Sequence, residues 1–149
     1  KKLIAAGYEV VIIDRLTDHN IDLKKARLNK FLNKKDYVFY NIELSDFPEL
    51  KKIFAKHKFD IICHLAAKTD LEFNSELYKK TNIHGTISIF ELAKDFEVLK
   101  VVFASSSMVY GNNTKMPFSE EDNTDHPLSL YAATKKYDEV LSHTYHHLY

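Results

Sequence analysis

Glycine is scarce in this chain, and the three glycines among its 149 residues stand far apart. A loop that cradles phosphate with backbone amides needs several glycines within a few residues at the start of a helix. Residues 1–7 instead predict the end of a helix that is already under way. We therefore expect an internal piece of a longer protein, whose first strand and glycine-rich loop precede residue 1.

Charge and cysteine exclude several further classes of protein. The 21 basic and 21 acidic residues balance, so charge does not favour nucleic acid or a membrane surface as a partner. No apolar stretch is long enough to span a membrane and no signal-peptide pattern occurs, so we expect a cytoplasmic location. The single cysteine, Cys63, lies in an apolar run and is expected to be a small buried residue, so disulfides within the chain are excluded.

Histidines gather near the end of the chain, where His143 and His147 would share one helix face. That spacing suits a metal, but no glutamate stands in an H-E-x-x-H frame and no third ligand is evident. We expect no metal site, and assign these histidines to a helix surface or to packing at a dimer face.

Short apolar runs alternate with helical patterns along the chain, which favours βαβ units and a parallel sheet. The predicted strands are Tyr8–Ile13, Tyr37–Ile42, Phe59–His64 and Leu99–Ala104, and the predicted helices are Leu23–Leu32, Phe47–Lys56, Glu76–Asp95 and Ser129–Tyr149. Asp46, followed by Pro48 and Glu49, has the pattern of a helix N-cap. The fold class is α/β, and residues 1–149 are expected to form one partial domain.

Polar residues follow the predicted strands in the places where ligands of such sheets bind, at the strands' carboxyl ends. They are Asp14, Glu43, Thr69 and the serine run Ser105–Ser107. An acid at the end of such a strand commonly accepts hydrogen bonds from the hydroxyls of an adenosine ribose, which favours NAD. A loop carboxylate or helix cap explains Asp14 equally well, and Arg15 leaves open a cofactor with a 2′-phosphate.

Tyr131 and Lys135 stand one helical turn apart, so both project from one helix face and the ammonium can lie beneath the phenol. A free phenol titrates near pH ~10, but a fixed positive charge favours the phenolate. Tyr131 could then take a proton from a substrate hydroxyl while hydride leaves the same carbon. The same spacing also arises by chance on many helices, and the surrounding α/β pattern favours the functional interpretation.

Several motifs together carry a resemblance to a known family. They are Val11-Ile-Ile-Asp14, Ile42-Glu-Leu-Ser-Asp46, His64-Leu-Ala-Ala67, Asn82-Ile-His-Gly85, Ala104-Ser-Ser-Ser-Met-Val-Tyr-Gly111 and Tyr131-x-x-x-Lys135. The chain resembles an extended short-chain dehydrogenase/reductase acting on nucleotide sugars. The stretches 14–19, 23–28, 113–119, 125–136 and 143–149 are most similar to UDP-glucuronate 4-epimerases.

The resemblance implies a Rossmann-type doubly wound parallel sheet, here without its first strand and glycine-rich loop and without the carboxyl-terminal substrate domain. In the strand order 3-2-1-4-5-6, the missing first strand would leave two inner strand edges without partners. The resemblance also implies a homodimer of the full-length protein, a UDP-sugar as substrate, and NAD as cofactor.

The family's site residues map onto this chain residue by residue. The resemblance assigns cofactor binding to Asp14, Glu43, Leu44, Leu65, Ala66, Ala67, Asn82, Ala104, Tyr131 and Lys135. Tyr131 would be the base, Lys135 would hold the nicotinamide ribose, and Ser106 would hydrogen-bond the sugar O4. Substrate binding falls to Ser106, Ser107 and Tyr131. The implied reaction takes hydride from C4 to NAD, lets the 4-keto sugar turn, and returns hydride to its other face.

Two departures from the family pattern bear on the substrate. Glu43 stands where the family usually has Asp, and the loop at residues 68–75 is shorter and lacks an expected Arg. Both departures leave the substrate less well determined than the cofactor. A UDP-glucose 4-epimerase and a UDP-glucuronate decarboxylase remain alternatives, because the contacts that would decide between them are expected in the carboxyl-terminal substrate domain. A non-catalytic nucleotide-binding module remains an alternative at the level of the fold. A 4,6-dehydratase is disfavoured, because Ser107 and Met108 stand where it needs an acid pair to expel water.

Overall fold

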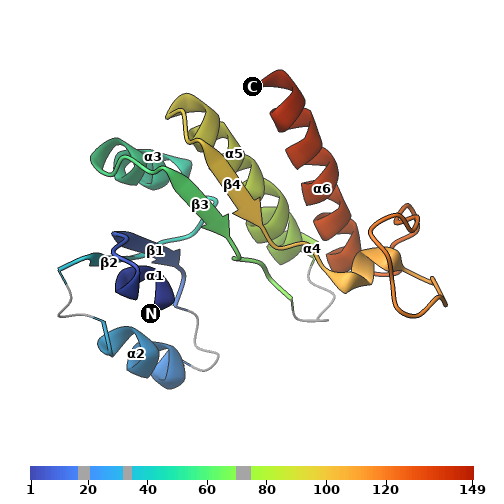
Figure 1. Ribbon diagram of the computed structural model, residues 1–149, viewed down its shortest axis with the longest axis horizontal. Coiled ribbons are helices and arrows are strands. Elements are labelled where there is room, and N and C mark those ends of the chain that lie inside the picture. Colours follow the sequence, from blue (N-terminus) through green and yellow to red (C-terminus); the bar gives the residue numbers. More distant parts are fainter. Residues whose placement is uncertain (17–20, 32–34, 70–74) are drawn as a thin grey trace. The chain divides into compact units, whose positions relative to one another are not determined.

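The computed structural model describes residues 1–16, 21–31, 35–69 and 75–149 (Figure 1). These residues divide into two compact units, Lys1–Glu43 and Leu44–Tyr149. The division falls just after the second strand. Each unit is described by itself below.

The first unit pairs two parallel strands. Its elements are α1 (Lys2–Ala5), β1 (Val10–Asp14), α2 (Ile21–Asn29) and β2 (Tyr37–Asn41). The ladder sets Val10 opposite Tyr37 and Asp14 opposite Asn41, so both strands end side by side. The predicted helix tail is confirmed: α1 ends before Gly7, whose φ of 86° reverses the chain toward β1. The predicted residue Leu32 at the end of α2 lies outside the described residues.

The second unit carries the remaining elements. They are α3 (Phe47–Lys56), β3 (Ile61–His64), α4 (Ser75–Leu77), η1 (Tyr78–His84), α5 (Gly85–Asp95), β4 (Lys100–Phe103), η2 (Ser107–Tyr110) and α6 (Leu130–Leu148). The predicted N-cap is confirmed, because the Asp46 carboxylate accepts a hydrogen bond from the backbone N–H of Glu49. Among the described residues, no helix is both long enough and apolar enough to cross a membrane.

The strands of the second unit also run parallel, with Ile61 opposite Lys100 and His64 opposite Phe103. All four predicted strands are therefore present, and their bounds differ from the predicted ones by one or two residues. The described strands form two separate ladders, β1 with β2 and β3 with β4. In the numbering of the predicted strand order, β1 and β2 correspond to strands 2 and 3, and β3 and β4 correspond to strands 4 and 5.

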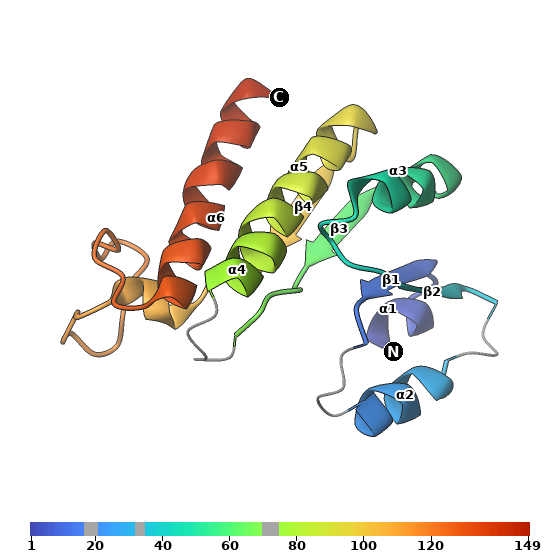
Figure 2. The same ribbon diagram turned by 180° about the vertical axis from the view of Figure 1, so that it is seen from behind.

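Helices cover one face of the β3–β4 ladder. Figure 2 shows α5 in front of β4, and Figure 1, seen from the opposite side, shows the strand in front of the helix. Phe90 of α5 meets Phe103 of β4 edge to face, with ring centroids 6.3 Å apart. Leu50 of α3 and Leu92 of α5 are fully buried. Hydrophobic burial on this face therefore holds the second unit together.

The expectation that Cys63 is buried is wrong, because its side chain is exposed. Successive side chains of a strand alternate between the two faces of a sheet. Cys63 lies opposite Val102 in the ladder, and Val102 is 49% exposed. An apolar run of residues cannot reveal which of its members face a covering helix, so this exposure could not be predicted from the run.

The predicted helix Glu76–Asp95 is present, but its middle differs from an ordinary α-helix. The run α4, η1 and α5 is continuous, and η1 is a π-helix of seven residues. π-helical turns are rare and often lie at functional sites, because the wider turn re-aims the side chains that it carries. Here η1 carries Asn82, which is fully buried.

Candidate active site

Helix α6 places Tyr131 and Lys135 at its start. Ser129 caps the helix by accepting a hydrogen bond from the Ala132 backbone N–H at 3.1 Å. Tyr131 therefore lies in the first turn, and Lys135 lies one turn later on the same face. Tyr131 is half-buried, whereas Lys135 is only 3% exposed.

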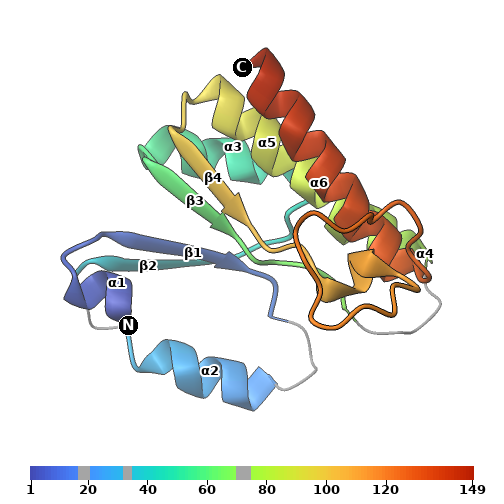
Figure 3. The same ribbon diagram turned by 45° about the vertical axis from the view of Figure 1, so that its right-hand side comes forward.

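Lys135 belongs to a cluster of buried polar side chains that joins β3, η1, α5 and α6. The members of this polar cluster are His64, Asn82, Thr86, Thr134, Lys135 and Asp138. Burying polar groups costs free energy unless they pair with one another. Packing alone would therefore favour apolar side chains at these positions. Figure 3 shows α5 and α6 side by side along this part of the unit.

The cluster's charged pair is Lys135 and Asp138. The Lys135 ammonium lies 2.7 Å from the Asp138 Oδ2, and both side chains are almost fully buried. Burial raises the pKa of the Asp138 carboxyl, against the opposing effects of Lys135 and of the Thr86 hydroxyl. The ammonium thus has a carboxylate partner further along α6.

His64 joins the cluster from the end of β3. Its Nε2 lies 3.0 Å from the Thr86 hydroxyl oxygen. The Thr86 hydroxyl in turn donates a hydrogen bond to the backbone carbonyl oxygen of Asn82 at 2.5 Å. Burial, followed by the nearby Lys135 charge, lowers the pKa of His64 to about 4. His64 is therefore neutral at physiological pH, and its Nε2–H donates to Thr86.

Asn82 ties together three parts of the second unit. Its Oδ1 accepts from the Lys68 backbone N–H at 2.7 Å, and its Nδ2 donates to the Lys68 carbonyl oxygen at 3.0 Å. The same Nδ2 donates to the Thr134 hydroxyl of α6, also at 3.0 Å. Asn82 therefore anchors the segment after β3 to the helix that carries Tyr131 and Lys135.

Replacing Asn82 with alanine removes all three hydrogen bonds and leaves both backbone groups of Lys68 without this partner. We expect N82A to lower the free energy of unfolding of the full-length protein by about 1–3 kcal/mol, the cost of buried polar groups left unpaired. Chemical unfolding followed by circular dichroism measures this change.

The matched control is Asn41→Ala. Asn41 also accepts a backbone hydrogen bond, from Leu16 at 2.9 Å, but it is exposed, so water can replace it. We expect N41A to change the same free energy by less than about 0.5 kcal/mol. Equal losses in the two variants would contradict the anchoring role of Asn82.

The serine run lies just beyond β4. Ser105 donates a hydrogen bond to the Glu139 carboxylate of α6 at 2.5 Å. Ser106 accepts one from the Met108 backbone N–H at 3.2 Å and so caps η2. Ser107 is exposed. The run is thus held against α6, and its hydroxyls differ in their partners.

The remaining predicted residues of this unit lie along the segments after the strands. Leu65 is 71% exposed, and Ala66 and Ala67 are half-buried. Ala104 is half-buried and continues the ladder by donating to the His64 carbonyl oxygen at 3.1 Å. Leu44 packs on Gly85, where an added Cβ would lie 2.9 Å from the Leu44 Cβ. Thr69 is exposed.

In the first unit, Asp14 is the last residue of β1, and Glu43 follows β2. The Asp14 carboxylate is half exposed and lies 3.9 Å from the Lys24 ammonium. Glu43 forms an ion pair with Arg15, the residue that left the choice of cofactor open. The structure thus places both predicted acids at neighbouring strand ends, as expected.

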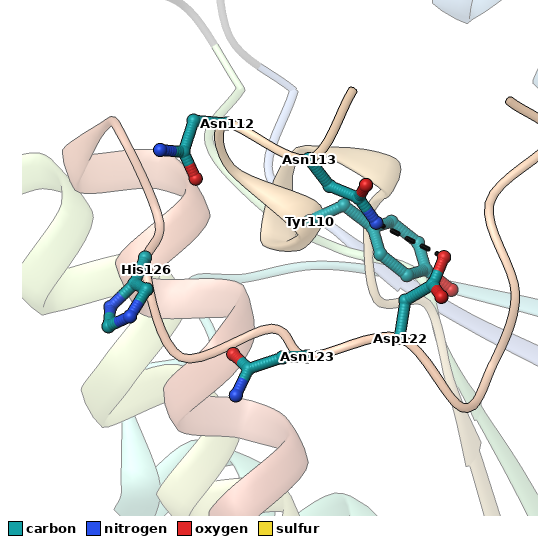
Figure 4. A pocket seen from close by; sticks show the side chains of 6 residues that line it. All are labelled: Tyr110, Asn112, Asn113, Asp122, Asn123 and His126. Carbon is teal, nitrogen blue, oxygen red and sulfur yellow. Dashed lines mark hydrogen bonds between the residues drawn. The ribbon is translucent and has the colours of Figure 1, made fainter. Parts of the chain in front are cut away.

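A polar pocket of about 480 Å³ lies beside η2, in the segment leading to α6. Tyr110, Asn112, Asn113, Asp122, Asn123 and His126 line it. Figure 4 shows these side chains around the opening, with Asn113 bonded to Asp122. No group of three or more potential metal ligands occurs among the described residues.

Sequence reasoning missed His64 as a functional candidate, and also Thr86, Asp138 and Glu139. A faint signal existed for two of them: His64 interrupts an apolar strand, and Asp138 stands three residues after Lys135 in a helix. The contacts of Thr86 and Glu139 join residues far apart in the sequence, so no local pattern announces them.

Parallel strands with polar residues at their carboxyl ends are typical of an α/β nucleotide-binding domain. The chain belongs to the family described as GDP-mannose 4,6 dehydratase, whose model matches residues 1–149. This is a family of extended short-chain dehydrogenase/reductases, so the resemblance seen in the sequence motifs is confirmed.

Similar proteins include epimerases and a dehydratase. A UDP-glucuronate 4-epimerase of Thermodesulfobacterium geofontis is 42% identical, over 99% of this chain and 46% of that protein. The structure of a UDP-glucose 4-epimerase of Thermotoga maritima with UDP-glucose matches with a TM-score of 0.84 and 28% identity, over 99% of this chain and 46% of that one. A dTDP-glucose 4,6-dehydratase of Streptomyces venezuelae with NAD bound matches with a TM-score of 0.85 and 26% identity, over 99% and 47%. The chain thus spans about half the length of the relatives that it matches.

Proposed function

We propose that the full-length protein is a nucleotide-sugar 4-epimerase that interconverts UDP-glucuronate and UDP-galacturonate with bound NAD. The observation that carries the proposal is the Tyr131 and Lys135 pair at the start of α6, with the serine run beside the same helix. Similarity to a UDP-glucuronate 4-epimerase over 99% of this chain supports the choice of substrate.

The described residues fit the part of NAD that they would hold. Lys135 offers a buried cation, and the segment after β3, which Asn82 anchors, offers the small side chains of Ala66 and Ala67, which would let a cofactor approach the backbone closely. Asp14, half exposed at the end of β1, would accept hydrogen bonds from the hydroxyls of the adenosine ribose. Glu43 and Leu44, which follow β2, would also contact the cofactor. When bound, NAD supplies the acceptor for hydride from C4 of the sugar.

This chain's own residues would handle the proton and the orientation of the sugar. Tyr131 would take the proton from O4 as general base, and Lys135 would favour its deprotonated form by its charge. Ser106, whose oxygen accepts the capping hydrogen bond from Met108, would donate its own proton to O4. Ser107, exposed beside it, would contact the substrate. A fixed base serves both sugar faces only if the ketone turns between the half-reactions.

A 4,6-dehydratase is the competing activity, since the family's description and one structural relative carry that name. That reaction also needs a general acid to expel water from C6. Ser107 and Met108, which follow Ser106, are exposed and carry no acid. Glu139, the carboxylate near the serines, is bonded to Ser105 instead. These observations favour the epimerase.

The test is to incubate the full-length protein with UDP-glucuronate and, separately, with UDP-glucose, without added cofactor. We expect conversion of UDP-glucuronate to UDP-galacturonate, detected by anion-exchange chromatography and sugar analysis. Conversion of UDP-glucose to UDP-galactose, or a decarboxylated product from UDP-glucuronate, would replace the proposed substrate or reaction and keep the fold. A 4-keto-6-deoxy product would identify a dehydratase.

The proposal includes a cytoplasmic homodimer of the full-length protein. Long helices that begin with Tyr131 and Lys135 are the surfaces through which such dimers would pair. Val140 and Leu148 of α6 are more than half exposed, which suits this role. Size-exclusion chromatography with light scattering on the full-length protein gives the oligomeric state.

A further inference from the structure

The proposed task of Lys135 is to hold a cofactor, but its ammonium already has a buried partner. It bonds to the Asp138 carboxylate at 2.7 Å, and both side chains are almost fully buried. Side chains of a helix lean toward its N-terminus, so the Asp138 carboxylate extends back toward Lys135. A strong attraction from Asp138 would therefore compete with a cofactor for the ammonium.

Asp138 is well suited to supply that attraction. Its side chain is fully buried, and its Oδ1 has no hydrogen-bond partner among the described residues. A buried carboxylate with one uncompensated oxygen gains strongly from a cation beside it. Charged neighbours on α6 do not replace Lys135: Glu139 is itself an acid, and Lys136 lies near Asp125 and Glu139.

The rest of the polar cluster supplies no other cation. His64, which reaches the cluster from β3, is neutral, and Thr86 of α5 offers only a hydroxyl. Lys135 is therefore the counter-ion of Asp138 within the cluster. Its ammonium cannot leave without exposing the carboxylate to an uncompensated burial cost.

We propose that Asp138 is a positioning residue that holds the Lys135 ammonium within the buried polar cluster, so that Lys135 reaches a bound dinucleotide only by weakening this pair. The inference rests on the proposed function insofar as it assumes that NAD binds at α6. Its consequence is that the pair opposes cofactor binding, because part of the binding free energy is used to redirect Lys135.

The experiment measures NAD affinity of the cofactor-stripped full-length protein by calorimetry. Asp138→Asn keeps the shape of the side chain and removes its charge, and Asp138→Ser removes the charge with less volume. Circular dichroism shows which of the two variants are folded. In each folded variant, we expect the dissociation constant for NAD to fall roughly threefold or more. A merely structural Asp138 would instead give unchanged or weaker binding.

A double-mutant cycle assigns the effect to Lys135. In a Lys135→Met background, Asp138→Asn should change NAD affinity by less than about twofold, because the ammonium that Asp138 holds is gone. The control Glu49→Gln breaks an exposed Lys–Glu pair of the same helical spacing on α3 and should leave NAD affinity unchanged.

The two proposals fail differently. If the unsubstituted protein binds no NAD, the proposed function is overturned and this inference falls with it. If that protein binds NAD but the charge-removing variants bind it no more tightly, or if the gain persists in the Lys135→Met background, this inference alone is overturned.

Discussion

Tyr131→Phe should lower the turnover of the full-length protein by about 10²–10⁴-fold, the usual loss when a general base, the role proposed for Tyr131, is removed. The substitution deletes one hydroxyl and keeps the ring. Tyr131 is half-buried in the first turn of α6, and that turn keeps its cap from Ser129. We therefore expect the fold and NAD binding to persist while product formation nearly stops. Initial rates with UDP-glucuronate measure the effect.

The control is Tyr137→Phe, on the same helix. Tyr137 is also half-buried, and burial raises the pKa of its phenol, so it has no tendency to ionise near neutral pH. We expect its turnover to stay within about twofold of the unsubstituted protein. Similar rates for the Tyr131 variant and the unsubstituted protein would favour the non-catalytic nucleotide-binding module instead.

Gly111→Ala should destabilise the full-length protein by about 3 kcal/mol or more. Gly111 ends η2 with a φ of 59° and a ψ of −120°, a conformation that residues with a Cβ avoid. An alanine Cβ there would lie 2.0 Å from the His126 carbonyl oxygen, which is backbone and cannot simply turn aside. The segment before α6 would have to move, and the polar pocket beside it would change shape. Chemical unfolding and crystallography of the variant measure both effects.

Gly7→Ala separates the two causes. Gly7 also has a positive φ, of 86°, but a Cβ there would meet nothing within 4 Å. Only the backbone strain remains, so we expect a loss of about 1 kcal/mol. If both variants lost the same free energy, the close approach of Gly111 to His126 would carry no energetic weight.

Local patterns in the sequence predicted the elements well. All four strands and the helices α3 and α6 lie where the apolar runs and caps indicated, with shifts of one or two residues at most. The Asp46 cap and the turn at Gly7 were predictable because each depends on neighbours along the chain. Tyr131 and Lys135 were predictable for the same reason, as their shared face follows from helical spacing.

Contacts between distant segments were not predictable in the same way. The cysteine expectation failed because covering helices, rather than the apolar run, decide which strand face is buried. The π-helical turn that buries Asn82 also has no simple sequence signature. Asn82 has two partners, Lys68 and Thr134, which lie in different parts of the chain.

The amino-acid order alone therefore determined the α/β class, the family and the residues that could perform proton transfer, because these depend on spacing within single elements. Tertiary structure alone decided which partners those residues have. The Lys135 ammonium pairs with Asp138 in a buried cluster with neutral His64, and Ser105 pairs with Glu139. Burial makes such pairs energetically important, and burial arises only when β3, α5 and α6 pack against one another.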